Sequence, residues 1–253
     1  MNCKVMGIVN VTPDSFSDGG KYFRPEEAIR RAKNLIADGA DIIDLGGEST
    51  RPGATPIGWE EEWARVEPVL TGLRGRSGGE NRWGGKVSVD TYHPETAARA
   101  IQAGADIINC VYPEPISEMM RLVAATPNVE LVVPVENPSI RRFVDSSNDR
   151  MRWNQSNIFD RLYIDPMIGF GTTREEDLAR LKSIGELATR GRVLVGASRK
   201  RIVKKLTGVK TPGKDVAGNV ALALWAAANG ASVVRVHDVR ETVQALKVWN
   251  SLR

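Results

Sequence analysis

The sequence predicts an α/β protein, a single domain over residues 1–253 folded as a (β/α)8 TIM barrel. Three observations predict this fold. Eight short runs rich in β-branched residues alternate with longer amphipathic stretches, the pattern of parallel strands joined by crossover helices. The length of 253 residues is close to the roughly 250 that such a barrel needs. A helix that ends in Gly just before a strand also recurs along the chain.

The strand candidates are short apolar runs bounded by turn residues. They are Lys4 to Val9, Asp41 to Leu45, Lys86 to Asp90, Asp106 to Asn109, Glu130 to Val135, Leu162 to Asp165, Arg192 to Val195 and Ser232 to Val236. The recurring helix end lies in the segments 37–43, 102–108 and 228–234, where Gly-Ala precedes the next strand. This repeat favours eight like units over a doubly wound sheet, which normally has fewer strands.

Helices are predicted between these strands. Pro25 begins the first and Gly39 ends it, and Pro94 and Gly104 bound another in the same way. Further helices are expected at Trp59 to Arg74, Ser117 to Ala125, Glu175 to Ala188, Asp215 to Ala228 and Val239 to Leu252. The connection from Glu136 to Arg161 carries turn residues where a helix would stand. We therefore expect that layer of the barrel to be incomplete.

Composition narrows the class of partner. The net charge is +4, and the Lys and Arg residues are scattered, so no nucleic acid partner is expected. No apolar run approaches the roughly 18 residues of a membrane span, and the N-terminus does not have the pattern of a secretory leader. We expect no membrane partner and a cytoplasmic location. Cys3 and Cys110 are too few and too far apart for a disulfide framework or a zinc site.

Polar residues follow nearly every predicted strand, at the end where barrel enzymes carry their chemistry. Asp90, Asn109 and Asp165 offer two carboxylates and an amide, which can pair with the N–H edge of a flat heterocycle such as a pterin. Phe170 stands between two glycines and is placed to lie against the ring face. Taken singly, each could be a helix cap or a turn former. Together on one rim they favour a binding site.

Cationic residues are expected on the same rim. They are Lys200, Arg51, Arg235 and His237. Asn10 is a candidate oxygen ligand for a hydrated Mg²⁺, which accepts few protein ligands when phosphate oxygens are present. A flat heterocycle beside a diphosphate indicates displacement of pyrophosphate. No serine–histidine–acid nucleophile is predicted.

Long motifs at these strand ends resemble the signatures of the dihydropteroate synthases. The motifs are Met6 to Gly20, Ile43 to Ala54, Val87 to Thr91, Asp165-Pro166 with Gly169-Phe170-Gly171, Ser198-Arg199-Lys200 and Arg235 to Asp238. The resemblance runs from the first strand to the last helix. It implies a transferase of folate biosynthesis that condenses 7,8-dihydropterin-6-ylmethyl diphosphate with p-aminobenzoate, giving 7,8-dihydropteroate and pyrophosphate.

The resemblance also implies roles for individual residues. Pterin contacts are expected from Asp90, Asn109, Asp165 and Lys200, and also from Phe170 because of its place between two glycines. The expected catalytic residues are Lys200, Asp90 and Asp165. The p-aminobenzoate site would be bordered by Phe16, Thr50, Pro52 and Ser198. Pyrophosphate would be held by Asn10, Arg235 and His237. Arg51, which follows the second predicted strand, is expected to contact it as well. Asn10 would also bind Mg²⁺. The loops 14–20 and 48–53 would close over the site. The resemblance also implies that the protein is a sulfonamide target and a homodimer. The apolar helix 220–228 is the expected interface.

The chain departs from the family pattern at three places near the expected pterin pocket. Cys110 follows Asn109 where Asp is usual, Val133-Pro134-Val135 replaces a Met-His-Met type segment, and Thr172 stands where Lys is usual. Two other interpretations stay open. One is a non-catalytic pterin-binding paralogue. The other is a methyltetrahydrofolate-binding methyltransferase module, which lacks a segment such as Ser198-Arg199-Lys200.

Overall fold

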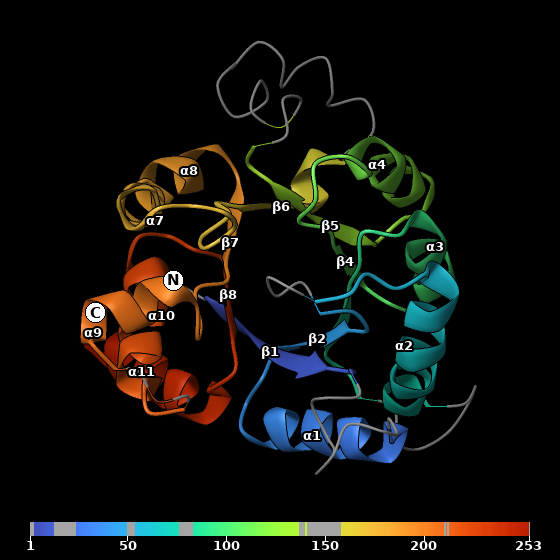
Figure 1. Ribbon diagram of the computed structural model, residues 1–253, viewed down its shortest axis with the longest axis horizontal. Helices are drawn as coiled ribbons and strands as arrows, with labels where there is room; N and C mark the ends of the chain where they lie inside the picture. The colour runs from blue at the N-terminus through green and yellow to red at the C-terminus, as the bar shows by residue number, and fades with distance from the viewer. Residues whose placement is uncertain are drawn as a thin grey trace.

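The protein is a closed barrel of eight parallel strands. The computed structural model describes residues 3–12, 24–49, 54–75, 83–136, 140, 158–209, 211 and 213–252. The strands follow one another around the barrel in chain order, and β8 pairs back to β1. Figure 1 shows the strands at the centre and the helices in a ring around them. The predicted (β/α)8 class is confirmed.

Each strand lies within one residue of its predicted limits. The strands are β1 (Lys4–Asn10), β2 (Ile42–Gly46), β3 (Lys86–Asp90), β4 (Ile107–Asn109), β5 (Glu130–Pro134), β6 (Leu162–Asp165), β7 (Arg192–Val195) and β8 (Val233–Val236). Parallel strands covered by helices are buried on both faces, so they read as short apolar runs. That property made them visible in the sequence.

Helices join the strands on the outside of the barrel. They are α1 (Pro25–Ala37), α2 (Trp59–Arg74), α3 (Pro94–Gln102), α4 (Ile116–Ala125), α7 (Arg174–Lys182), α8 (Ile184–Arg190), α9 (Arg201–Thr207), α10 (Val216–Ala228) and α11 (Val239–Ser251). The repeated helix end has one backbone geometry: Gly39, Gly104 and Gly230 have φ of 101°, 96° and 93°. Glycine suits these positions because other residues rarely adopt positive φ.

Two helix predictions needed correction. The single helix expected from Glu175 to Ala188 is two helices, α7 and α8, which meet at Ser183. Ser183 has ψ of −3°, which ends the first helix, but its N–H still bonds to the carbonyl of Ala179, and it serves as the N-cap of the second. Helix α9, which was not predicted as a separate element, follows β7 directly. The expected gap in the barrel layer at 136–161 lies largely outside the described residues.

The core has two layers. Inside the barrel, seven buried side chains form one cluster, with one from every strand except β3: Met6, Ile42, Ile107, Val132, Tyr163, Leu194 and Val233. A larger cluster fills the space between the strands and the surrounding helices. Both faces of the sheet are therefore packed, and the barrel is a solid support for its rim. Within the described ranges, no helix is long and apolar enough to cross a lipid bilayer.

A group of charges closes the N-terminal end of the barrel. Glu130, at the start of β5, accepts hydrogen bonds from Lys86 Nζ at 2.5 Å and from Arg192 Nη1 at 2.6 Å. The Arg192 guanidinium also lies over the Tyr163 ring, 4.0 Å from its centroid. Burial alone would raise the pKa of Glu130, but these two cations lower it overall. We call Lys86, Glu130 and Arg192 the basal cluster.

Candidate active site

Four polar side chains meet at the opposite, C-terminal end of the barrel. Arg235 of β8 donates from Nε to Asp44 Oδ2 at 2.6 Å and from Nη2 to Asp90 Oδ2 at 2.7 Å. Asn109 Nδ2 donates to the same Asp44 oxygen at 3.3 Å. We call Asp44, Asp90, Asn109 and Arg235 the rim cluster. It confirms that the third, fourth and eighth strands bring their polar residues to one place.

Strand register explains how the rim cluster forms. Asp90 is the partner of Gly46 on one side and of Asn109 on the other. Side chains at matched positions of neighbouring parallel strands point to the same face. Asp90 and Asn109 thus point together into the mouth of the barrel, where a ligand can meet both.

The rim cluster contains two hydrogen-bond acceptors without a partner among the described residues. Asp44 Oδ1 and Asn109 Oδ1 are buried and have no hydrogen-bond partner among the described residues. Buried polar atoms without partners are costly, so they mark positions where a ligand's N–H groups can bind. Both residues lie beside Asp90 in the rim cluster, and unpaired acceptors at this place suit the donor edge of a pterin.

Burial strongly perturbs the acidity of the rim carboxylates. Desolvation raises the pKa of Asp90 to about 7, against the opposing effect of Arg235, while Asp44 and Glu62 raise it further. The pKa of Asp165 is also raised, again chiefly by desolvation and in spite of the nearby Lys200. Perturbed carboxylates gathered at one rim are typical of functional sites.

Lys200 faces these carboxylates from the beginning of α9. Its Nζ donates to the Ile168 carbonyl at 2.6 Å and lies 4.1 Å from the centroid of the Phe170 ring. Desolvation lowers the pKa of Lys200 to about 8, although Asp165 and Asp90 favour its charged form. The structure therefore brings Lys200, Phe170 and Asp165 together, as the sequence predicted. It also places a cation against the ring that was expected to contact the ligand.

Ser198 and His237 lie together at the ends of β7 and β8. Ser198 Oγ is 3.1 Å from His237 Nδ1 and accepts a hydrogen bond from the His237 N–H at 3.3 Å. The sequence assigned Ser198 to the p-aminobenzoate site and His237 to the pyrophosphate site, and it did not predict the contact between them. Arg199 is directed elsewhere, since its Nη2 donates to Asp238 at 2.7 Å.

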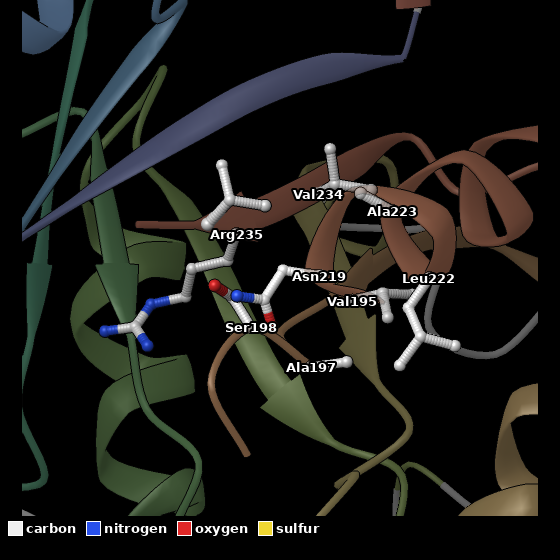
Figure 2. A pocket seen from close by; sticks show the side chains of 9 residues that line it. Val195, Ala197, Ser198, Asn219, Leu222, Ala223, Val234 and Arg235 are labelled. Carbon is white, nitrogen blue, oxygen red and sulfur yellow. The ribbon is translucent and has the colours of Figure 1, made fainter. Parts of the chain in front are cut away.

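A small hollow lies behind this part of the rim, between β7, β8 and α10. It encloses about 200 Å³ of empty space, open solvent included, and is lined mainly by apolar groups such as Leu222 and Val195. In Figure 2 the guanidinium of Arg235 points away from these apolar side chains. Its hydrogen bonds run instead to Asp44 and Asp90. The hollow therefore adjoins the site and offers little to a polar ring.

Several predicted site residues lie outside the described residues. They are Phe16, Thr50, Arg51 and Pro52, so their expected contacts with p-aminobenzoate and pyrophosphate stay predictions. Asn10, the expected Mg²⁺ ligand, is described. It ends β1, is half-buried, and pairs in register with Gly46. A single amide oxygen at the rim fits a Mg²⁺ ion whose other ligands are water and diphosphate oxygens.

A second group of possible metal ligands lies beside the rim. One ligand atom from each of Glu48, Glu62 and His93 falls within 4.8 Å of the others. Thr91 Oγ1 donates to Glu62 Oε2 at 2.6 Å, and His93 Nδ1 approaches that oxygen at 3.1 Å. These contacts already hold Glu62 as a structural acceptor. An imidazole also suits transition metals better than Mg²⁺, so Asn10 remains the better candidate for Mg²⁺.

The three departures from the family pattern have different surroundings. Cys110 is buried in the layer between strands and helices, where burial raises the pKa of its thiol to about 12. Asn109 is oriented by Asp44 and not by its neighbour. Val133 belongs to the same outer layer. Thr172 is buried and donates to Asp177 Oδ1 at 2.5 Å.

Two acidic residues near the site, Asp44 and Glu62, were assigned no functional role from the sequence. Asp44 lies within the motif Ile43 to Ala54, at the end of the second predicted strand, but no role was assigned to it. Glu62 stands in a run of three glutamates at the start of α2, which looks like an ordinary solvated helix start. Both are fully or almost fully buried, at 0% and 1% exposed. A charged residue at a position that must face the core was the available signal.

Known proteins match this chain over nearly its whole length. A family model for pterin binding enzymes matches residues 6–237. Dihydropteroate synthase of Neisseria meningitidis serogroup B is 37% identical, over 98% of this chain and 92% of its own length. That of Streptococcus pyogenes serotype M6 is 36% identical, over 99% of this chain and 96% of its own.

Solved structures agree with these relatives. Xanthomonas albilineans dihydropteroate synthase with 4-aminobenzoic acid has a TM-score of 0.85 and 40% identity, and the match covers 99% of this chain and 93% of that one. Burkholderia cenocepacia dihydropteroate synthase complexed with 7,8-dihydropteroate has a TM-score of 0.81 and 34% identity, over 99% and 91% of the two chains. The chain therefore belongs to the pterin-binding enzymes and, within them, to the dihydropteroate synthase family of transferases.

Proposed function

We propose that this protein condenses 7,8-dihydropterin-6-ylmethyl diphosphate with p-aminobenzoate to form 7,8-dihydropteroate and pyrophosphate, as a step of folate biosynthesis. The observation that carries this proposal is the rim cluster, which offers Asp90 and two unpaired buried acceptors to one ligand. The relatives reported above are dihydropteroate synthases, which favours this function over a methyltransferase module.

The rim cluster and Asp165 hold the pterin in this proposal. The amidine-like N–H edge donates to Asp90 and Asp165, and Asn109 contributes its amide beside them. Because desolvation raises the pKa of Asp90 to about 7, the carboxylate is poorly solvated and gains by pairing with ligand N–H donors. Phe170 lies against the ring, and Lys200 contributes a positive charge beside the pterin and the incoming amine.

Pyrophosphate departs from the carbon that the amine of p-aminobenzoate then bonds. In the proposal, His237, Arg235 and Arg51 hold its oxygens together with Asn10. Ser198 borders the amine's benzoate with Phe16, Thr50 and Pro52. Mg²⁺ at Asn10, when bound, would offset charge on the departing diphosphate. Cationic and hydrogen-bonding groups at a leaving phosphate stabilise the transition state because negative charge builds up there.

A homodimer and a cytoplasmic location complete the proposal. Ala217, Ala221 and Trp225 are exposed and recur every fourth residue along α10, so they form an apolar stripe on one helix face. Trp225 is 48% exposed. An apolar stripe of this kind suits a second copy of the chain. The two free cysteines fit a reducing compartment.

One assay tests the catalytic proposal. Purified protein is incubated with the dihydropterin diphosphate, p-aminobenzoate and Mg²⁺, and dihydropteroate and pyrophosphate are measured separately. We expect equal amounts of both. Parallel reactions without amine or without Mg²⁺ assign each requirement. Calorimetry with a pterin analogue runs beside them, since binding without any pyrophosphate would identify the non-catalytic paralogue.

A further inference from the structure

The turn between β6 and α7, residues 166–172, has an unusual backbone. Met167, Gly169 and Gly171 have φ of 63°, 77° and 67°. A non-glycine residue such as Met167 is unfavourable in this region, and a turn with several such positions keeps its shape only when its surroundings hold it. We call residues 166–172 the Phe170 turn. It needs anchors.

Asp177 is one of those anchors, from the first turn of α7. Its Oδ1 accepts the Gly169 N–H at 2.7 Å and the Thr172 hydroxyl at 2.5 Å. Asp177 is 1% exposed, so both hydrogen bonds form away from water and both involve a charged acceptor. Such bonds are stronger than neutral ones. Thr172 stands where the family usually has a lysine, and its hydroxyl donates the second of these two hydrogen bonds.

The Phe170 turn in turn fixes the position of Lys200. The Ile168 carbonyl, one residue from Gly169, accepts the Lys200 ammonium at 2.6 Å, and the Phe170 ring lies beneath that ammonium. The fit is close, because a side-chain carbon added at Gly169 would lie 2.9 Å from Lys200 Cδ. Movement of the turn would therefore move the ammonium.

We propose that Asp177 is a positioning residue of the pterin site: it fixes the Phe170 turn and thereby the Lys200 ammonium, toward which it also contributes a buried negative charge. The inference rests on the proposed function of Lys200, and it adds a buried carboxylate that does not itself touch the ligand. The charge of Asp177 adds to the effect of Asp165 and Asp90, since all three raise the pKa of Lys200 against its burial.

Two variants separate the shape effect from the charge effect. Asp177→Asn keeps an oxygen acceptor but removes the charge, whereas Asp177→Ala removes both. For Asp177→Ala we expect KM for the pterin substrate to rise about tenfold, the size expected from one lost charge-assisted hydrogen bond, with KM for p-aminobenzoate changed less. For Asp177→Asn we expect KM within about twofold of wild type, and an alkaline limb of the pH–rate profile that moves to lower pH.

Thr173→Ala is the matched control. Thr173 caps the same helix by accepting from the Glu176 N–H, with Glu176 bonding back to the Thr173 N–H, but it does not bond to the Phe170 turn. Its loss should lower the stability of the protein, because a helix cap is removed, and leave KM and the alkaline limb unchanged. An equal rise in KM for Thr173→Ala would overturn the inference by making helix stability the cause.

A measurement without catalysis keeps the inference apart from the proposed function. The Lys200 side chain is titrated by NMR at its Cε resonance, assigned from the spectrum of Lys200→Ala. We expect its pKa to fall from wild type to Asp177→Asn. An unchanged Lys200 titration overturns the inference even if dihydropteroate is made, whereas a lowered pKa in a protein that makes no dihydropteroate sustains it and rejects the proposed function.

Discussion

The two ends of the barrel contain buried charge of opposite balance. In the basal cluster one carboxylate, Glu130, meets two cations, and its pKa is lowered. In the rim cluster one cation, Arg235, meets two carboxylates, and the pKa of Asp90 is raised to about 7. At the base, both carboxylate oxygens of Glu130 are paired with cations of the protein itself. The rim is left short of hydrogen-bond donors, and the N–H groups of a substrate can supply them.

The difference shows how one scaffold separates stability from function. Neither cluster can be identified by its residue types, since both consist of buried Asp or Glu with Lys or Arg. What distinguishes them is whether the carboxylates outnumber their cations. A buried group whose pKa shifts in favour of its uncharged form destabilises the folded state when it is charged. Such destabilisation is expected at a site where ligand binding offsets it.

The largest effect is expected from Lys200→Ala. Loss of a charge-assisted contact worth about 1.5–3 kcal/mol should lower turnover by roughly 10- to 150-fold, because each 1.36 kcal/mol is about tenfold in rate. Steady-state kinetics check this, with circular dichroism to confirm the fold. Lys205→Ala, an exposed lysine on the same helix, should behave like wild type. Normal turnover in Lys200→Ala would remove Lys200 from the site.

At the other end, Glu130→Gln should reduce stability and leave chemistry alone. Lys86 and Arg192 would lose their shared anion, which we expect to cost about 2 kcal/mol of unfolding free energy. Urea denaturation measures the loss, and kinetics at 25 °C should match wild type. Glu118→Gln, on the exposed face of α4, is the control and should change neither. A loss of turnover in folded Glu130→Gln would break the separation between the two ends.

A smaller effect is expected from Asp90→Asn at the rim. The amide presents a donor where the pterin needs an acceptor, so affinity for a pterin analogue should fall about tenfold, or about 1.4 kcal/mol. Affinity for p-aminobenzoate should change less. Calorimetry with each ligand decides, and an unchanged pterin affinity would place the pterin elsewhere on the rim.

The pH dependence of stability should have opposite sign at the two ends. Because the pKa of Glu130 is lowered by folding, its contribution is present above the unfolded value of about 4.3 and is lost as pH falls. Because the pKa of Asp90 is raised to about 7, folding is favoured by its protonated form. That contribution is lost as pH rises from about 4 through about 7.

Denaturation of wild type, Glu130→Gln and Asp90→Asn from about pH 2 to about pH 8 tests these signs, because the Glu130 contribution is lost only below its unfolded pKa of about 4.3. Wild type should lose stability relative to Asp90→Asn as pH rises, and relative to Glu130→Gln as pH falls. Parallel curves for all three proteins would mean that neither group titrates differently on folding.

Strand ends were predictable from the sequence, whereas contacts between distant segments were not. Buried parallel strands produce apolar runs, and the residues after them had to meet at one rim, so Asp90, Asn109 and Asp165 were found. The pairing of Arg235 with Asp44 depends on barrel closure and register, which no local pattern records. The role of Asp177 could not be predicted from the sequence, because the helix dipole stabilises an acidic residue in the first turn of any surface helix.

Closure of the barrel also constrains how the site can be assembled during folding. Asp44 and Arg235 are 191 residues apart, and β1 has no partner on its outer edge until β8 arrives. Contacts of such high sequence separation slow folding and form late. A chain still lacking its last strand therefore lacks the cation that joins Asp44 to Asp90. The binding site comes into existence only when the final strand docks, so ligand affinity reports on completion of the fold.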